Sequence, residues 1–407
     1  MIPSRRVVTL GLTASLLSAC APGLAAPVTR MRPVRNPDFD RWVTSYKSRA
    51  ASRGIAPETL ARAFRDAGFL PGVIERDRNQ TESIRTLEDY LAIAASDDRI
   101  ATGRKMLRQH EKTLSAIAER YSVEPRIVTA VWGLESRYGA RRGDVPVISA
   151  LATLAFDGRR GAFFERQLTA ALRILQNGDI SPQRMTGSWA GAMGHTQFIP
   201  TSYLAYAVDF RGDGRRDIWS DDPTDALAST AAYLSRFGWT SGQPWGVEVR
   251  LPDGFDTRLI GRKISRSPAD WAALGLRDMA GRRVPDHGSA SIIRPAGAVG
   301  PSFMIFGNFN VIARYNNAES YVIGVGHLSD RLAGGAPIRA AFAPDAQGMT
   351  LEDRKELQRR LTARGFDTQG VDGVIGANTI AAIRAYQKEA GLAVTGTATL
   401  DLLARLR

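Results

Sequence analysis

The chain has 407 residues, of which 44% are hydrophobic and 23% charged, a composition that suits a globular protein of two or three domains. Its single cysteine excludes a disulfide framework. The formal net charge of +13 would suit nucleic acid binding in a cytoplasmic protein, but the N-terminal segment indicates export and argues against that partner.

The first 26 residues have the pattern of an export signal. A short basic region is followed by an apolar run at 7–17, which is too short to anchor stably across a bilayer. The run continues into Leu-Ser-Ala-Cys at 17–20, which resembles a bacterial lipobox, so we predict lipidation at Cys20. The alternative is ordinary cleavage near residues 25–26, which would discard Cys20. A basic exported protein would face cell-wall carboxylates or an anionic membrane surface, although a solvated surface explains the charge equally well.

Helical patterns dominate the chain after a linker at 27–35. Between Phe39 and about Ile117 the sequence is helical and rich in alanine, and Pro57 suits a first helical turn. Further helices are predicted at about 124–138, 147–155, 161–176, 199–207 and 224–237. Residues 244–300 are richer in Pro, Gly and β-branched residues, which indicates short strands and loops, and helix returns within 303–328 after Gly307.

The C-terminal part is predicted to be a separate small unit. Residues 334–348 are rich in Gly, Ala and Pro, which is typical of a linker. Three helical patterns follow at 351–363, 377–389 and 397–406. Gly365 and Gly391 follow the first two patterns, where a helix-terminating glycine is expected. A unit this small makes a thin core, which favours a binding module over an enzyme.

Several conventional catalytic sites are absent from the sequence. Four scattered histidines and one cysteine give no zinc cluster, and the chain has no Gly-x-Ser-x-Gly elbow and no phosphate loop. Carboxylate chemistry therefore remains the main enzymatic option.

Glu135 is the leading candidate for that chemistry. It lies beside an apolar helical stripe and one turn before Gly139, which we expect to end the helix. The stripe consists of Ile127, Ala130, Val131, Leu134 and Tyr138. Apolar neighbours and the negative helix end disfavour the ionised carboxylate, so we expect a raised pKa, as a general acid needs near neutral pH; Arg137 would oppose that shift. The alternative, a solvated surface glutamate, is the commoner case.

Two segments combine glycine, aromatic and polar residues in a way that suits ligand binding. Arg159 and Arg160 lie between aromatic residues and suit an acidic or polar ligand, unless they are solvated arginines at a helix N-terminus. In the segment 188–200, small residues allow close backbone approach while Ser188 and Gln197 supply hydrogen-bonding groups. This make-up is common in sugar grooves, and its alternative is a tightly packed turn between helices.

A third segment, 314–321, carries Tyr and Asn side chains able to contact hydroxyl or acetamido groups. Packing within the protein is again the alternative.

Residues 209–220 resemble an EF-hand calcium loop. Asp209 and Asp213 occupy the first and fifth positions, with a glycine at the sixth. Two features depart from the pattern, because Arg211 stands at the third ligand position and Ser220 replaces the acid at the twelfth. Asp221, Asp222 or Asp225 could substitute for that acid, so Asp209, Asp213 and one of these three are candidate calcium ligands. The alternative is a salt-bridged loop that needs no metal.

Together these motifs resemble lytic murein transglycosylases of the membrane-bound B type, over roughly residues 36–330. The matching motifs, in order, are GLESRYG with Glu135, GRRGAFF, SWAGAMGHTQFIPTSY, DALASTAAYLSRFGW and RYNNAESY. The C-terminal unit resembles the peptidoglycan-binding domain 1 family, with marks that include Leu357, Asp372, Tyr386 and Thr395. The expected organisation is an export or lipoprotein signal at 1–26, a catalytic domain at 36–333, a linker at 334–348 and a peptidoglycan-binding domain at 349–407.

The resemblance implies a mainly α (α+β) fold: a lysozyme-like catalytic domain with a small strand-containing insert, then a small three-helix domain. It implies cleavage of the β-1,4 bond between N-acetylmuramic acid and N-acetylglucosamine, leaving 1,6-anhydromuramyl ends, with Glu135 as the single acid/base. The implied substrate-binding residues are Arg159, Arg160, Ser188, Gln197, Phe198, Tyr233, Tyr315, Asn316 and Tyr321. No cofactor is required beyond a possible structural calcium ion, for which the resemblance favours Asp209, Asp213 and Asp225 as ligands.

The resemblance also bears on partners and location. A lipoprotein signal occurs in this family, which implies a periplasmic monomer that binds peptidoglycan glycan strands, binds no nucleic acid and is anchored to the outer membrane. Two other functions remain open. A hydrolytic muramidase would need a second carboxylate across the cleft. A catalytically silent wall-binding scaffold is expected to have a disrupted motif around the catalytic glutamate.

Overall fold

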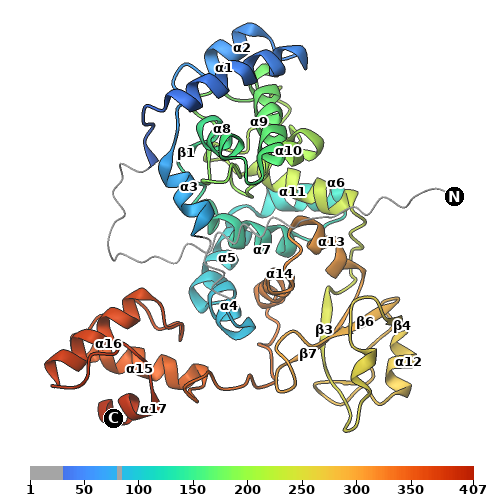
Figure 1. Cartoon of the computed structure of the whole chain (residues 1–407). Coiled ribbons are helices and arrows are strands. Elements are labelled where there is room, and N and C mark those ends of the chain that lie inside the picture. The colour runs from blue at the N-terminus through green and yellow to red at the C-terminus, as the bar shows by residue number, and fades with distance from the viewer. Residues whose placement is uncertain (1–30, 80–84) are drawn as a thin grey trace. The chain divides into compact units, whose positions relative to one another are not determined.

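The computed structural model describes residues 31–79 and 85–407, and it divides into two compact units (Figure 1). The first, here called the helical unit, comprises residues 31–79 and 97–236. The second, the mixed unit, comprises residues 85–96 and 237–407. The described residues confirm the predicted fold class, because helices dominate and strands form only small sheets. Cys20 and the rest of the export signal lie outside the described residues.

The helical unit is built almost entirely from α-helices. Its helices are α1 (Pro37–Ser52), α2 (Pro57–Ala63), α3 (Pro71–Arg78), α5 (Asp97–Gln109), α6 (Glu111–Tyr121), α7 (Pro125–Ser136), α8 (Val147–Asp157), α9 (Gly161–Gln176), α10 (Pro200–Tyr206) and α11 (Thr224–Arg236). Strands β1 (Val145–Pro146) and β2 (Thr186–Gly187) pair antiparallel. Helices α8 and α9 lie side by side, and α7 packs against α5, α6 and α11. As a result, α7 lies at the centre of the unit.

Proline in the first turn marks the start of five helices in this unit: α1, α2, α3, α7 and α10. Proline suits that position because its fixed φ is helical and its missing N–H would have no partner there. The prediction for Pro57 is therefore confirmed.

The end of α7 differs from the prediction. The helix was expected to run to Tyr138 and to end at Gly139, but it ends at Ser136. Arg137 and Tyr138 both adopt left-handed conformations, with φ of 52° and 57°. Tyr138 is held there because its hydroxyl donates to the Arg99 carbonyl at 2.8 Å and its ring packs on Trp132. This tertiary contact offsets the cost of two consecutive non-glycine left-handed residues.

The predicted linker at 27–35 is partly wrong. Val34 forms an antiparallel bridge with Phe69, and its N–H donates to the Phe69 carbonyl at 2.9 Å. Residues 27–30 lie outside the described residues.

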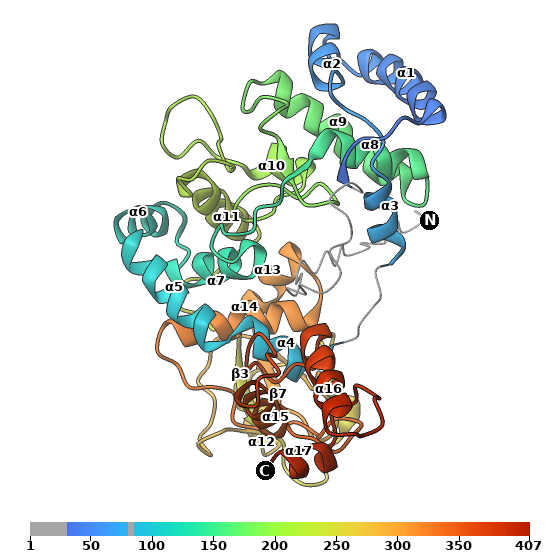
Figure 2. The same cartoon turned by 90° about the vertical axis from the view of Figure 1, so that its left-hand side faces the viewer.

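The mixed unit contains a five-stranded antiparallel sheet. Its strands are β3 (Gly246–Arg250), β4 (Ser265–Arg266), β5 (Arg277–Asp278), β6 (Ala290–Ile293) and β7 (Ser302–Ile305), in the order β4-β6-β7-β3-β5. Its helices are α4 (Leu87–Ala94), α12 (Pro268–Ala273), α13 (Gly307–Tyr315) and α14 (Glu319–Leu332), with a 3₁₀ turn at Thr257–Leu259. Trp271 is fully buried in the core under the sheet, and α4 packs against α14 (Figure 2). The short strands predicted within 244–300 are thus present.

The predicted linker at 334–348 is held in place along part of its length. The N–H groups of Arg339 and Ala340 donate to the Glu248 carboxylate of β3, at 2.9 and 2.7 Å, and the Arg339 side chain donates to the Met279 carbonyl. These bonds fix the middle of the segment against the sheet of the same unit.

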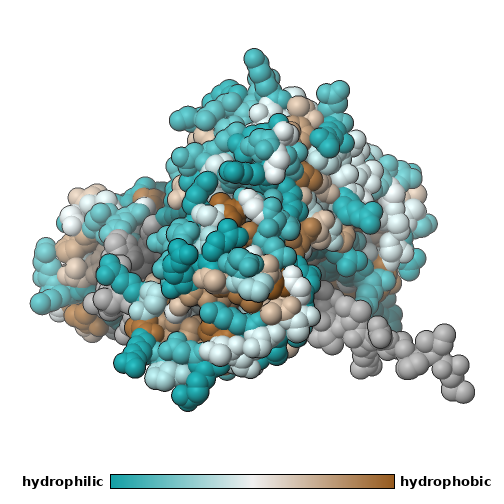
Figure 3. Space-filling view, turned by 90° about the horizontal axis from the view of Figure 1, so that it is seen from above, coloured by the Kyte–Doolittle hydropathy of each residue, from teal (hydrophilic) through white to brown (hydrophobic). Residues whose placement is uncertain are grey.

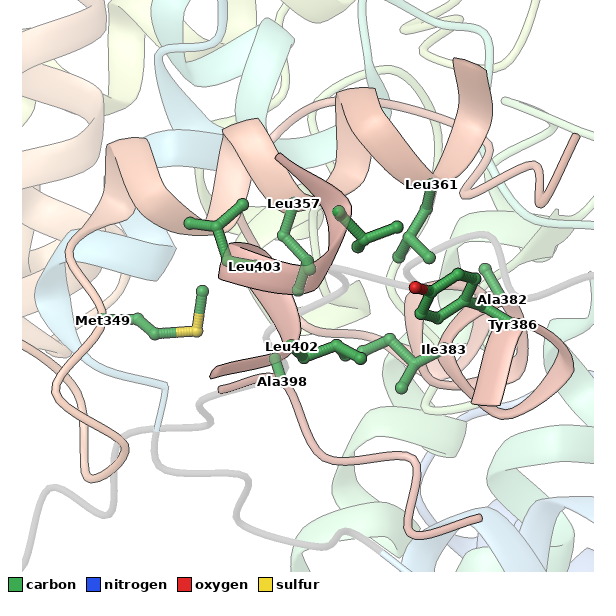
Figure 4. Close-up of a cluster of buried hydrophobic side chains, with 10 residues drawn as sticks. Met349, Leu357, Leu361, Ala382, Ile383, Tyr386, Ala398, Leu402 and Leu403 are labelled. Carbon is green, nitrogen blue, oxygen red and sulfur yellow. The ribbon is translucent and has the colours of Figure 1, made fainter. Parts of the chain in front are cut away.

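The C-terminal module (residues 349–407) contains three helices around its own core. They are α15 (Leu351–Ala363), α16 (Ala377–Glu389) and α17 (Leu400–Leu406). Gly365 and Gly391 follow the first two with φ of 90° and 68°, as expected for helix-terminating glycines. The side chains of Leu357, Ile383 and Leu403 meet between the helices (Figure 4).

The face of the molecule in Figure 3 is mostly hydrophilic, with smaller hydrophobic areas between. In 31–79 and 85–407, no helix is both long enough and apolar enough to span a bilayer.

Candidate functional site

Glu135 is the penultimate residue of α7 and the least buried residue in its last two turns. From Ile127 to Ser136 every residue of the helix is buried except Glu135, which is partly exposed. The predicted apolar stripe is buried along its whole length. The carboxylate is therefore carried by a rigid, buried helix end and remains accessible to solvent.

Arg137, which follows the helix, forms an ion pair with a residue of another helix. Its guanidinium lies 2.7 Å from the Asp98 carboxylate at the start of α5, and both side chains are exposed. An exposed pair of this kind contributes little stability, about 0–1 kcal/mol.

Ser188 and Gln197 lie in a tightly hydrogen-bonded loop between β2 and α10. The Ser188 hydroxyl accepts from the Ala192 N–H at 3.0 Å, which closes a turn. Gln197 has a left-handed backbone (φ 55°), and its amide nitrogen donates to the carbonyls of Arg142 (3.0 Å) and Gly194 (2.8 Å). Both side chains are largely buried. These bonds are what the packed-turn alternative predicted, and they also hold both groups in fixed orientations.

Phe198 and Tyr233 belong to an aromatic cluster. Phe198 is only 2% exposed, and its ring centre lies 6.0 Å from that of Tyr233 on α11. Tyr206 of α10 packs edge-on against Tyr233 at 4.9 Å. Helix α11 also packs against α7, so the cluster belongs to the same unit as Glu135.

Arg159 and Arg160 share one carboxylate that the sequence analysis missed. Asp77, at the end of α3, is 2% exposed. Arg159 donates from Nε to its Oδ2 at 2.8 Å, and Arg160 donates from Nη2 to its Oδ1 at 2.8 Å. The Arg160 guanidinium also stacks on the Phe164 ring. One carboxylate balances only one of the two cationic charges, so the partly exposed pair retains one positive charge for an anionic ligand.

Tyr315, Asn316 and Tyr321 belong to the mixed unit. Tyr315 is the last residue of α13, and Asn316 caps that helix. The Asn316 side-chain oxygen accepts from the Ala318 N–H at 3.0 Å, which fixes its carboxamide. Tyr321 lies in the first turn of α14 and is largely buried. The three residues are therefore grouped at one helix–helix junction.

The EF-hand-like loop is arranged around Arg211. The guanidinium of Arg211 lies 3.3 Å from an oxygen of Asp213, 3.4 Å from one of Asp222 and 3.5 Å from one of Asp225. The Asp209 carboxylate accepts three backbone N–H bonds from within the loop. Burial raises the pKa of Asp225 above its ordinary value, although three backbone N–H donors oppose that shift.

The predicted calcium ligands do not converge. Among the described residues, no group of three or more His, Cys, Asp or Glu side chains is placed to hold a metal ion. In this arrangement the carboxylates contact Arg211 and backbone N–H donors.

His195 is the second feature that the sequence analysis missed. It is 3% exposed, and its ring contacts Trp132 of α7. It lies within the Gly-rich motif at 188–200, although in the sequence alone it is one of four scattered histidines. Its place in that motif was the available signal.

Comparison with protein families gives two matches. A model of the transglycosylase SLT domain family matches residues 38–330, and a model of a peptidoglycan binding domain family matches residues 350–406. The membrane-bound lytic murein transglycosylase B of Escherichia coli (strain K12) is 34% identical over 243 residues, which are 58% of this chain and 64% of that protein. The match thus spans slightly less than two thirds of that relative's length.

Solved structures extend the similarity. SltB3 from Pseudomonas aeruginosa is 46% identical with a TM-score of 0.74, and the match covers 91% of this chain and 99% of that one. It has been solved with NAG-NAM-pentapeptide and with NAG-anhNAM-pentapeptide. Slt35 from Escherichia coli, solved in complex with calcium, is 29% identical with a TM-score of 0.62, and the match covers 75% of this chain and 97% of that one.

Proposed function

Because the chain belongs to the transglycosylase SLT domain family, we propose that it is a lytic transglycosylase that cleaves the β-1,4 bond between N-acetylmuramic acid and N-acetylglucosamine in peptidoglycan. The reaction is non-hydrolytic and leaves 1,6-anhydromuramyl ends. The main support is SltB3, 46% identical over nearly its whole length, whose complexes contain both a NAM and an anhNAM form of the same fragment.

Glu135 acts as the single acid/base in this proposal. As a carboxylic acid it protonates the glycosidic oxygen, which leaves with N-acetylglucosamine, and as a carboxylate it then takes the proton from the 6-hydroxyl of the N-acetylmuramic acid. That hydroxyl attacks C1 in place of water, and its proximity favours the intramolecular reaction. The position of Glu135 supports this role, because it is the one partly exposed residue in the buried stretch 127–136, so its carboxylate is both accessible and rigidly held.

The remaining predicted residues bind the glycan. The substrate's own acetamido group meets the developing oxocarbenium charge, which makes a second enzyme carboxylate unnecessary. Asn316, in the mixed unit, is a ligand for an acetamido group. In the helical unit, Ser188, Gln197 and Tyr233 bind the glycan, with Phe198 packed behind Tyr233. In the mixed unit, Tyr315 and Tyr321 bind glycan as well. Arg159 and Arg160 carry one positive charge that Asp77 does not balance. Their guanidinium groups contact the glycan or the carboxylates of its peptide.

The C-terminal module binds peptidoglycan and raises the local concentration of substrate around the catalytic domain. We propose that lipidation at Cys20 anchors the protein to the outer membrane and keeps it in the periplasm. The membrane-bound relative from Escherichia coli supports this location.

We also propose that the loop at 209–225 needs no calcium. Arg211 stands where the EF-hand pattern has a ligand, and its guanidinium contacts the same aspartates that would bind the ion. The Arg211 guanidinium would thus neutralise these carboxylates, as a bound calcium ion does in an EF-hand.

The test of the catalytic assignment is Glu135→Gln, with Glu119→Gln as its matched control. Glu119 is an exposed glutamate on α6, the neighbouring helix. Release of soluble fragments from isolated cell walls should be abolished in Glu135→Gln, because an amide cannot donate the proton, and should be unchanged in Glu119→Gln. Both variants should still sediment with cell walls. Wild-type release by Glu135→Gln would refute the assignment.

A further inference from the structure

His195 contacts the catalytic helix on both sides of Glu135. Its ring Nδ1 accepts a hydrogen bond from the indole N–H of Trp132, three residues before Glu135, at 3.1 Å. Its backbone carbonyl accepts from the hydroxyl of Ser136, the residue that follows Glu135. The same hydroxyl accepts from the Gly139 N–H at 2.9 Å. One residue therefore fixes the last turn of α7 through both its ring and its backbone.

The other side of His195 is tied to a second segment. Its N–H donates to the Ile218 carbonyl at 3.1 Å, and its ring Nε2 lies 2.7 Å from the Ser220 carbonyl. Arg142 holds that segment as well, because its guanidinium donates to the carbonyls of Trp219 and Ser220 and to the Asp221 carboxylate. His195 thus bridges the helix that carries Glu135 and a chain segment that Arg142 keeps in place.

Only one form of the imidazole satisfies both ring contacts. Nδ1 must accept from the indole N–H of Trp132, so the ring is neutral with its proton on Nε2. That proton faces the Ser220 carbonyl at 2.7 Å, although the Arg142 guanidinium also lies 3.2 Å from Nε2. Burial lowers the pKa of His195, and the nearby Arg142 lowers it further, while Ser220, Asp221 and Asp217 oppose the shift. The ring is therefore uncharged and links α7 to the segment 218–220 in a fixed orientation.

The backbone leaves space for this ring at Gly139. A Cβ atom added at Gly139 would lie 2.5 Å from Nδ1 and 2.6 Å from Cε1 of His195. The residue also has φ +86°, which favours glycine. Gly139 is thus required here for the approach of His195 as well as for its own conformation.

The loop that carries His195 also carries Gln197. The Gln197 amide donates to the carbonyl of Arg142, the same arginine that holds the segment under His195. The predicted acid and one predicted groove residue therefore share a single hydrogen-bonded support.

We propose that His195 is a positioning residue for Glu135, which fixes the carboxyl relative to the groove through the hydrogen bond between its Nδ1 and Trp132. This inference rests on the proposed role of Glu135 as acid/base. Displacing a positioned proton donor by about 1 Å lowers the reaction rate by about a hundredfold. His195 therefore affects turnover without contacting substrate.

Two amide substitutions separate the two ring contacts. In His195→Asn the side-chain oxygen can take the place of Nδ1 and still accept from Trp132. In His195→Gln the amide nitrogen can take the place of Nε2 and donate to Ser220, while the Trp132 contact is lost. Trp132→Phe removes the same contact from the other side. Trp271→Phe is the control, since Trp271 is a fully buried indole that donates to the Ala290 carbonyl in the mixed unit.

The experiment measures kcat and KM on soluble, uncross-linked glycan strands, together with melting temperature. His195→Gln and Trp132→Phe should each lower kcat by about tenfold or more, with KM within about twofold, and the double variant should lose no more than either single one. His195→Asn should keep kcat within about threefold of wild type. Trp271→Phe should lower the melting temperature without lowering kcat.

Three results would overturn the proposal. Wild-type kcat in His195→Gln would show that the contact does not position Glu135. A rise in KM at unchanged kcat would place His195 in substrate binding, and losses that simply follow melting temperature in all variants, Trp271→Phe included, would reduce it to a structural role. Failure of the proposed function is separate, because it would appear as activity in Glu135→Gln.

The tautomer gives a readout that does not depend on any variant folding. Nitrogen-15 NMR of the wild-type protein should show His195 neutral and protonated at Nε2 at about pH 7. A charged ring, or a proton on Nδ1, would contradict the hydrogen bond from Trp132 and with it the proposal.

Discussion

Asp77 and Arg159 form a two-point contact between α3 and the turn before α9. The Arg159 guanidinium donates to the Asp77 carboxylate (2.8 Å) and to its backbone carbonyl (2.8 Å). Because Asp77 is 2% exposed, its charge is buried and is compensated only by arginines.

Asp77→Asn should therefore destabilise the protein and weaken substrate binding. Removing the buried charge leaves two arginines without a counter-ion, and because both are partly exposed we expect a loss of about 2 kcal/mol in unfolding free energy, less than for a fully buried pair. KM should rise because the two guanidinium groups lose their fixed orientation. Chemical denaturation and steady-state kinetics measure the two effects.

Arg78→Ala is the control for that prediction. It removes the neighbouring pair with Asp157, in which the arginine is largely exposed, and should cost about 1 kcal/mol or less with no change in KM. Equal effects in the two variants would mean that Asp77 has no special role.

The loop at 209–225 should be indifferent to calcium in the wild-type protein and should become calcium-dependent in Arg211→Asp. That substitution restores an acid at the third ligand position and removes the cation that neutralises Asp213 and Asp225. Melting temperature should rise with calcium and fall with chelator only in that variant, and the added change Asp213→Ala should remove the response. Arg215→Asn, at an exposed position in the same loop, is the control.

A calcium-dependent melting temperature in the wild-type protein that disappears in Asp213→Ala would contradict this account. It would mean that the ion displaces Arg211 and that the loop is a calcium site.

His327 in α14 should make the protein sensitive to mild acid. Burial, together with a smaller effect of Arg331, lowers its pKa to about 4. The folded-state pKa lies below the unfolded value of about 6.5, so the stabilisation is fully present above about pH 6.5 and is lost as the pH falls through about 4. Between about pH 7 and pH 5 the wild type should lose about 2 kcal/mol more unfolding free energy than His327→Gln. Parallel pH dependence in the two proteins would rule this out.

The fold was largely predictable where local chemistry decides it. Pro57 begins a helix as its fixed φ requires, and Gly365 and Gly391 end helices in left-handed conformations. The end of α7 was not predictable, because Tyr138 adopts a left-handed conformation through contacts with Arg99 and Trp132. No local signal in the sequence reveals such tertiary contacts.

Some residues of the candidate site could be identified from the sequence, and others could not. Glu135 was identified from its apolar stripe and its motif, and its position on a buried helix agrees with the pattern. Asp77 was missed because it lies 82 residues before Arg159 in the chain, and an isolated aspartate on a helix usually faces solvent. His195 was missed because a single histidine shows its hydrogen bonds only once α7 and the loop at 188–200 are packed together.

The mass of the products from digested cell walls tests the central claim most directly. The proposed mechanism predicts muropeptides that end in 1,6-anhydromuramic acid, each lighter by one water than its hydrolysed counterpart, and their disappearance in Glu135→Gln. Products with ordinary reducing ends would contradict it, because water would then be the nucleophile and the enzyme would be a hydrolytic muramidase.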